Sequence, residues 1–174
     1  DTSFFKSDLH IVIVDPHRPG HEVRYHPGET NLRMAQVIVV NKMGTANPEA
    51  VREVVKNIKM TNPKAHVIKA DSVVSVRDPA VVKGKRVLVV EDGPTLTHGD
   101  MAYGAGYVAA KRFGASEIVD PRPYAVGSIK KAFEKYTQLQ AVLPALGYGK
   151  RQVRELQETI NAVPCDLVLV GTPF

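Results

Sequence analysis

The sequence predicts an α/β protein in which helices flank a mostly parallel sheet, arranged in two parts. Three observations lead to this prediction. Short runs rich in Val and Ile recur along the chain, helical patterns separate them, and a polar stretch with Pro and Gly at residues 77–85 interrupts the alternation. Of the 174 residues, 44% are hydrophobic and 24% are charged, which is typical of a folded globular chain.

Apolar runs of strand length form the first set of elements. Most are rich in Val and Ile and show little alternation, as expected for strands that are buried on both faces of a parallel sheet. We therefore predict strands at residues 9–14, 36–40, 66–69, 86–90, 117–120 and 166–171.

Helical patterns lie between these strands. The clearest begins at Pro48, a residue favoured at the first position of a helix, and Asn47 before it is a suitable N-cap. We predict helices at residues 48–59, 101–113, 128–136 and 152–163. With a boundary placed in the stretch 77–85, the predicted domains are 1–82 and 83–174.

Charge and cysteine content limit the classes of function. The chain has 23 Lys and Arg against 18 Asp and Glu, a net charge of +5, which suits nucleic acid, an anionic membrane surface or a highly phosphorylated ligand. An ordinary basic protein fits equally well, because no long run of basic residues occurs. The single cysteine, Cys165, excludes an internal disulfide and fits a reducing compartment. No signal peptide and no membrane-length apolar stretch are visible, so we expect a cytoplasmic protein.

The first candidate site is the segment DPHRPGHE at residues 15–22, which follows the first predicted strand. Ligands in open α/β sheets bind beyond the carboxyl ends of strands. Three interpretations stay open: an anion site, a transition-metal site that uses the histidines with Asp15 and Glu22, and a solvated loop without a ligand. In the anion site the substrate-binding residues would be His17, Arg18, His21 and Arg24.

The second candidate site is VVNKMGTA at residues 39–46, where a strand ends in Asn41 and Lys42. In P-loop GTPases such a strand ends in Asn-Lys-x-Asp, and the Asp binds guanine. Here Gly44 occupies the Asp position, so the carboxylate specific for guanine is absent. We assign Asn41 and Lys42 to nucleotide binding; the alternative is an ordinary turn between strand and helix.

The third candidate site is VVEDGPTLTHGD at residues 89–100. Thr95, Thr97 and His98 offer donors for a phosphate, while Glu91 and Asp92 could hold Mg²⁺ or act as a base. We assign His98, Asp92 and Glu91 to catalysis and the two threonines to substrate binding. The alternative is a tight loop with helix caps.

Arg122 is a further candidate site residue, and one nucleotide-binding motif is absent from the sequence. Arg122, in DPRPY at residues 120–124, ends the next strand and is a candidate phosphate contact; a structural role is the alternative. The pattern G-x-x-x-x-G-K-[ST] does not occur, so these 174 residues contain no phosphate-binding P-loop.

Three strings carry a resemblance to a known family. VVEDGPTLTHGDMAYGAG at 89–106, VDPRPYAVGSI at 119–129 and VDPHRPGHE at 14–22 resemble the cyclic 2,3-diphosphoglycerate synthetase family, whose relatives are often labelled predicted P-loop GTPases. Family members are two to three times longer. The resemblance implies that this chain, which does not begin with Met, is their C-terminal portion: the second half of a P-loop NTPase domain and then a smaller α/β domain.

The resemblance also implies an activity. It is ATP-dependent ring closure of 2,3-diphosphoglycerate, a ligase reaction found in heat-loving methanogens, with ATP and Mg²⁺ as cofactors. We expect ATP rather than GTP because of Gly44, an inactive isolated chain, and a homo-oligomer that binds a small phosphorylated substrate and neither nucleic acid nor membrane. Arg18 and His98 should converge at one carboxyl edge of the sheet. The competing hypothesis is a metal-insertion GTPase in which His17, His21 and His26 carry the metal.

Overall fold

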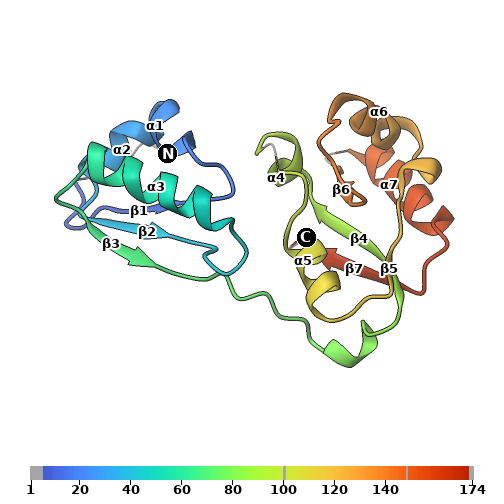
Figure 1. The fold of residues 1–174 in the computed structure, drawn as a ribbon. Helices are drawn as coiled ribbons and strands as arrows, with labels where there is room; N and C mark the ends of the chain where they lie inside the picture. Colours follow the sequence, from blue (N-terminus) through green and yellow to red (C-terminus); the bar gives the residue numbers. More distant parts are fainter. Residues whose placement is uncertain (1–5, 100, 148, 173–174) are drawn as a thin grey trace. The chain divides into compact units, whose positions relative to one another are not determined.

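The computed structural model describes residues 6–99, 101–147 and 149–172, and it divides the chain into two compact units, Asp1–Val73 and Val74–Phe174. In Figure 1 each unit has helices packed on parallel strands. The predicted α/β class, with helices flanking parallel sheets, is confirmed. No described helix combines the length and the apolar character that crossing a membrane requires.

Unit 1, Asp1–Val73, has a three-stranded sheet with the order β1-β2-β3. Both strand pairs are parallel, and Val14, Val40 and Lys69 lie level at the carboxyl edge. The elements of unit 1 are β1 (Ile11–Val14), α1 (His21–Arg24), α2 (Gly28–Met34), β2 (Val37–Val40), α3 (Pro48–Thr61) and β3 (His66–Lys69).

The three helices of unit 1 lie on the same face of its sheet (Figure 1). Between them and the sheet is a core that includes Leu32, Ile38, Val40, Val54 and Ile58, all fully buried. Alternate residues of the strands point to the other face, and Ile11 and Ile13 there are 56% and 68% exposed. The prediction that the strands are buried on both faces is therefore wrong for unit 1, because within this unit the helices cover only one face.

Unit 2, Val74–Phe174, is built around the long strand β4 (Arg86–Asp92). β7 pairs along most of β4, β5 pairs with its first residues and β6 with its last, and all three pairings are parallel. The other elements are the 3₁₀ turns η1 (Pro79–Val81) and η2 (Arg122–Tyr124), α4 (Gly93–Thr97), α5 (Ala105–Arg112), β5 (Glu117–Ile118), α6 (Gly127–Lys135), β6 (Leu143–Ala145), α7 (Lys150–Ala162) and β7 (Leu167–Gly171).

The central strand of unit 2 is buried on both faces, as predicted. Val87 and Val89 belong to one core cluster with Ala110 of α5, whereas Leu88 and Val90 belong to a second cluster with Ile129 of α6. Successive side chains of a strand point to opposite faces, so the two clusters lie on the two sides of the sheet.

Several predicted boundaries differ from the structure. The units divide between Val73 and Val74 rather than between 82 and 83, because Val82 is 1% exposed and packs in the core of unit 2. The predicted helix 101–113 begins later, at Ala105. Six short elements in the described part of the chain were not predicted. They are α1, which starts directly after the left-handed Gly20 (φ 89°), α2, α4, β6 and the 3₁₀ turns η1 and η2.

Candidate functional site

Asp15 lies at the centre of a charged cluster at the carboxyl edge of unit 1. It follows β1, and its Oδ2 atom lies 2.7 Å from Lys42 Nζ and 3.4 Å from Arg18 Nη2. The backbone N–H of His17 donates to its other oxygen, at 3.0 Å. Lys42 follows the neighbouring strand β2, so the parallel pairing of β1 and β2 brings these two residues together.

The charges of this cluster favour an anion as ligand. Burial alone would raise the pKa of Asp15, but the hydrogen bonds from Lys42 and His17 and the charges of Lys42 and Arg18 outweigh it and lower that pKa. Asp15 is therefore ionised at neutral pH. One carboxylate and two cations leave the trio with an excess of one positive charge, and Arg18 and Lys42 are each about one-third exposed. An exposed excess of positive charge attracts phosphates or carboxylates.

The backbone at Lys42 has an uncommon conformation. Its φ is 56°, in the left-handed region that residues with a side chain rarely adopt. The N–H of Asn41 donates to the carbonyl of Val14, and the ion pair with Asp15 fixes the Lys42 side chain. Strained backbone of this kind is common at binding sites, where the surrounding contacts maintain it.

The loop that contains Lys42 is also tied to the end of β3. Asn41 Nδ2 donates to Ser72 Oγ at 3.0 Å, Met43 N–H donates to the carbonyl of Ala70, and Gly44 N–H donates to the carboxylate of Asp71. Asp71 thus brings a carboxylate to the loop in which position 44 has none. Asp71 was not among the predicted site residues, although it follows a predicted strand just as Asp15 does.

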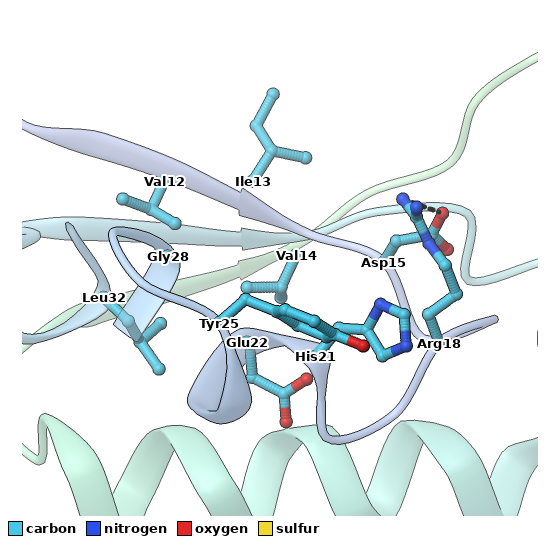
Figure 2. Close-up of a pocket in the computed structure, with 10 residues that line it drawn as sticks. All are labelled: Val12, Ile13, Val14, Asp15, Arg18, His21, Glu22, Tyr25, Gly28 and Leu32. Carbon is cyan, nitrogen blue, oxygen red and sulfur yellow. Dashed lines mark hydrogen bonds and ion pairs between the residues drawn. The ribbon is translucent and has the colours of Figure 1, made fainter. Parts of the chain in front are cut away.

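A cavity of about 680 Å³ opens beside β1. Val12, Val14 and Leu32 line its apolar part, and Figure 2 shows Arg18 and Asp15 together with the rings of His21 and Tyr25 nearby. The two rings meet edge to face, with 4.9 Å between their centroids. Arg18 and His21, two of the predicted substrate-binding residues, therefore line one cavity. Arg24 is a third predicted substrate-binding residue, and its side chain lies against Gly20. A Cβ added to Gly20 would lie 3.4 Å from the Nε atom of Arg24.

The three histidines of the hypothetical metal site have separate partners. His17 Nε2 lies 2.9 Å from Thr45 Oγ1, His21 contacts Tyr25, and His26 Nδ1 lies 3.5 Å from Thr30 Oγ1. Within the part of the chain that the structure describes, no three His, Cys, Asp or Glu residues form a group that could hold a metal ion. The metal-site interpretation of the segment 15–22 thus gains no support.

In unit 2, Glu91 is enclosed rather than open to a ligand. It is 1% exposed, and its carboxylate accepts hydrogen bonds from the N–H groups of Gly104, at 3.1 Å, and Tyr107, at 2.8 Å. Burial raises its pKa, although these N–H groups oppose the shift. A Cβ on Gly104 or Gly171 would overlap the carboxylate. Glu91 thus occupies the amino end of α5 and does not fit a role as Mg²⁺ ligand.

The other predicted residues of this loop make local contacts. Asp92 caps α4 by accepting hydrogen bonds from the N–H and Oγ1 of Thr95, at 3.0 and 2.7 Å. Thr97 is buried and donates to the carbonyl of Gly93, and its Oγ1 lies 3.1 Å from His98 Nδ1. This geometry matches the alternative of a tight loop with caps, while the catalytic role of Asp92 and His98 stays a prediction.

Arg122 forms a forked ion pair with Asp120, in which its Nε and Nη2 atoms donate at 2.9 and 2.6 Å. The hydrogen bond with Arg122 lowers the pKa of Asp120.

The predicted convergence of Arg18 and His98 assumed a single sheet. That assumption is wrong, because Arg18 follows β1 of one sheet and His98 follows β4 of a separate sheet in the other unit.

Comparison with known proteins gives one informative match. No family model matches the chain. Over 173 residues, 99% of its length, the chain is 61% identical to a protein of Thermococcus kodakarensis (strain ATCC BAA-918 / JCM 12380 / KOD1) named arginine synthetase ArcE. The match covers 39% of that relative, so the chain spans well under half of the relative's length.

Proposed function

We propose that this chain is part of a nucleotide-dependent synthetase whose full-length form makes arginine. The observation that carries the proposal is the 61% identity to arginine synthetase ArcE across nearly the whole chain. A synthetase couples bond formation to cleavage of a nucleoside triphosphate, so such a protein must bind polyanionic phosphates. The cluster of Asp15, Arg18 and Lys42 supports this requirement.

In this proposal Arg18 and Lys42 bind an anionic group of the nucleotide or of a phosphorylated intermediate. The planar guanidinium of Arg18 suits two oxygens of a phosphate, and Lys42 adds a compact charge. Asp15 pairs with both cations and orients them. His21 lines the same cavity as Arg18, and His17 and Arg24 are further candidate donors.

ATP is the proposed nucleotide, and Mg²⁺ would enter with it and neutralise its phosphate charge. We assign no ligand for Mg²⁺ among the described residues, because Glu91 is enclosed and Asp15 is already neutralised by two cations. The 174 residues lack the P-loop pattern, so alone they should not hydrolyse ATP.

A second candidate function is ring closure of 2,3-diphosphoglycerate. The strings at residues 14–22, 89–106 and 119–129 favour it through their resemblance to the cyclic 2,3-diphosphoglycerate synthetase family. Ring closure brings like charges together and therefore needs cationic groups at the site. Arg18 and Lys42 meet that need as well as they meet the need of arginine synthesis.

The full-length protein can separate the two candidates. A synthetase runs in reverse when supplied with its product, so arginine with ADP and phosphate, or with AMP and pyrophosphate, should yield ATP. Incubation with ATP, Mg²⁺ and 2,3-diphosphoglycerate, followed by phosphorus NMR, tests ring closure. ATP formation that depends on arginine supports the first candidate, and a cyclic product without it supports the second. The absence of both reactions contradicts the proposal.

Arg18→Ala tests the site in the same protein. Loss of a hydrogen bond to a charged group should weaken binding of the anionic ligand by about 1.5–3 kcal/mol, measured by calorimetry with the substrate that proves active. Arg33→Ala is the matched control, because Arg33 also pairs with a carboxylate of unit 1, that of Glu29, but does not line the cavity. If the two variants bind the anionic ligand equally well, Arg18 does not contact the ligand and its role is to stabilise the fold.

The choice of nucleotide is tested with Asp71→Ala. We expect ATP to raise the melting temperature of the full-length protein more than GTP does, because Gly44 offers no carboxylate to guanine. Stronger stabilisation by GTP, lost in Asp71→Ala, would contradict this expectation and would identify Asp71 as the acceptor for the base.

A further inference from the structure

The sheet of unit 1 has a largely apolar face that its own helices leave open, with His66 beside Val37 as the polar member among the described strands. Parallel register places Ile11 beside Val37, and Ile13 beside Val39 and Ile68. These five β-branched residues, here called the open face, share one side of the sheet, and Ile11, Ile13 and Ile68 are 56%, 68% and 43% exposed. Figure 2 shows Ile13 pointing away from the side on which Val14 lies.

The outer edge of the same sheet is also available. Among the described strands β1 pairs only with β2, so the other edge of β1 has no strand partner. Exposed edges and large apolar patches are rare in parallel sheets, which are normally covered on both faces.

We propose that the open face and the free edge of β1 bind an α/β segment of the full-length protein that lies outside these 174 residues. In this arrangement a strand adds parallel to β1, and a helix lays an apolar stripe over the open face. The relative at 61% identity is much longer than this chain, and more than half of its length lies outside the match. The full-length protein therefore has enough chain to supply such a segment.

Unit 2 is a poor occupant by comparison. Its central strand β4 already has a core cluster on each side, with α5 contributing to one and α6 to the other. A second copy of the chain is also less suitable. Two copies of the edge strand β1 related by a two-fold axis would pair antiparallel over only four residues, and would leave the open face uncovered.

Thiol labelling of the full-length protein tests the proposal without any activity measurement, so its failure is distinct from failure of the proposed function. Ile13→Cys and Met60→Cys are each made in a Cys165→Ser background. Met60 is the matched control because it is 73% exposed, on α3 of the same unit. Maleimide labelling rates are divided by those of the urea-unfolded protein. We expect Cys at position 13 to be protected at least ten-fold more than Cys at position 60.

Other outcomes overturn the proposal. Equal labelling at the two positions would show that the face is open in the full-length protein. Protection that disappears on dilution, in step with a loss of mass by light scattering, would identify a second copy. Protection of position 13 in the folded 174-residue chain alone would identify unit 2. Because a substitution can itself disturb packing, amide hydrogen exchange of unsubstituted residues 11–14 is measured in parallel, and slow exchange is expected.

Discussion

The two units use the same kinds of element but differ in how their sheets are covered. In unit 1, α1, α2 and α3 lie on one face, and Ile11 and Ile13 of β1 remain exposed on the other. In unit 2, α5 and α6 contribute to clusters on opposite faces of β4, and its residues 87–90 are buried. Unit 2 therefore buries its central strand with its own helices, whereas the helices of unit 1 leave the other face of its sheet exposed.

The difference shows that strand composition alone does not decide burial. IVIV at residues 11–14 and VLVV at residues 87–90 are equally apolar. The first behaves as a strand covered on one side and the second as a strand covered on both.

The charged residues that follow or end these strands differ between the units in the same way. The Asp15 cluster of unit 1 is partly exposed, whereas Glu91 of unit 2 is enclosed by backbone N–H groups.

The largest difference in stability is expected between two separate variants, one that truncates a buried side chain of β4 and one that truncates an exposed side chain of β1. Leu88→Ala should lower the free energy of unfolding of unit 2 by about 2–5 kcal/mol, because it leaves a cavity in a closed core. Ile13→Ala should lower that of unit 1 by less than about 1 kcal/mol in the 174-residue chain, because its side chain is already in water. Hydrogen exchange resolved by unit gives both values, and similar losses would break the comparison.

Two glycines test how closely the backbones approach in each unit. A Cβ on Gly93 would lie 2.5 Å from the carbonyl oxygen of Ala145, so Gly93→Ala should destabilise unit 2 by about 1–3 kcal/mol, as overpacking does. Gly28, at the start of α2, has nothing within 4 Å of that position. Gly28→Ala should therefore be neutral or stabilising by up to about 1 kcal/mol. Urea unfolding measures both, and a destabilised Gly28→Ala would contradict this account.

The smallest effect is a difference in pH dependence between the two carboxylates. The folded pKa of Asp15 is lowered from 3.8, so its contribution to stability is present above that value and is lost as the pH falls through the folded pKa. The folded pKa of Glu91 is raised from 4.5, so its contribution is present at low pH and declines as the pH rises through the folded pKa.

Melting temperatures of Asp15→Asn and Glu91→Gln, measured between about pH 3 and 7, check these signs. The deficit of Asp15→Asn relative to the unsubstituted chain should grow as the pH rises. The deficit of Glu91→Gln should shrink over the same range. Parallel changes in the two variants would show that the two environments do not differ as the structure indicates.

Much of the local structure could be predicted from the sequence. Strand 66–69 has the predicted bounds, and Asn47 caps α3 by accepting a hydrogen bond from the N–H of Glu49 at 2.8 Å. The position of the segment 15–22 just beyond a strand was also predictable. These features depend on neighbouring residues in the chain: a run of β-branched side chains, a cap next to a proline, and the end of a strand.

Only the tertiary structure decided which residues meet. Lys42 donates a hydrogen bond to Asp15, 27 positions away in the sequence, and Gly44 donates to Asp71, also 27 positions away. The N–H of Tyr107 donates to Glu91, 16 positions away. Val82 belongs to unit 2 because it packs in that core, and Ile13 is exposed because the helices of unit 1 all lie on the other face. Hydrophobicity and capping are properties of a local stretch of sequence. The pairing of distant loops and the coverage of a sheet face depend on how the whole chain packs.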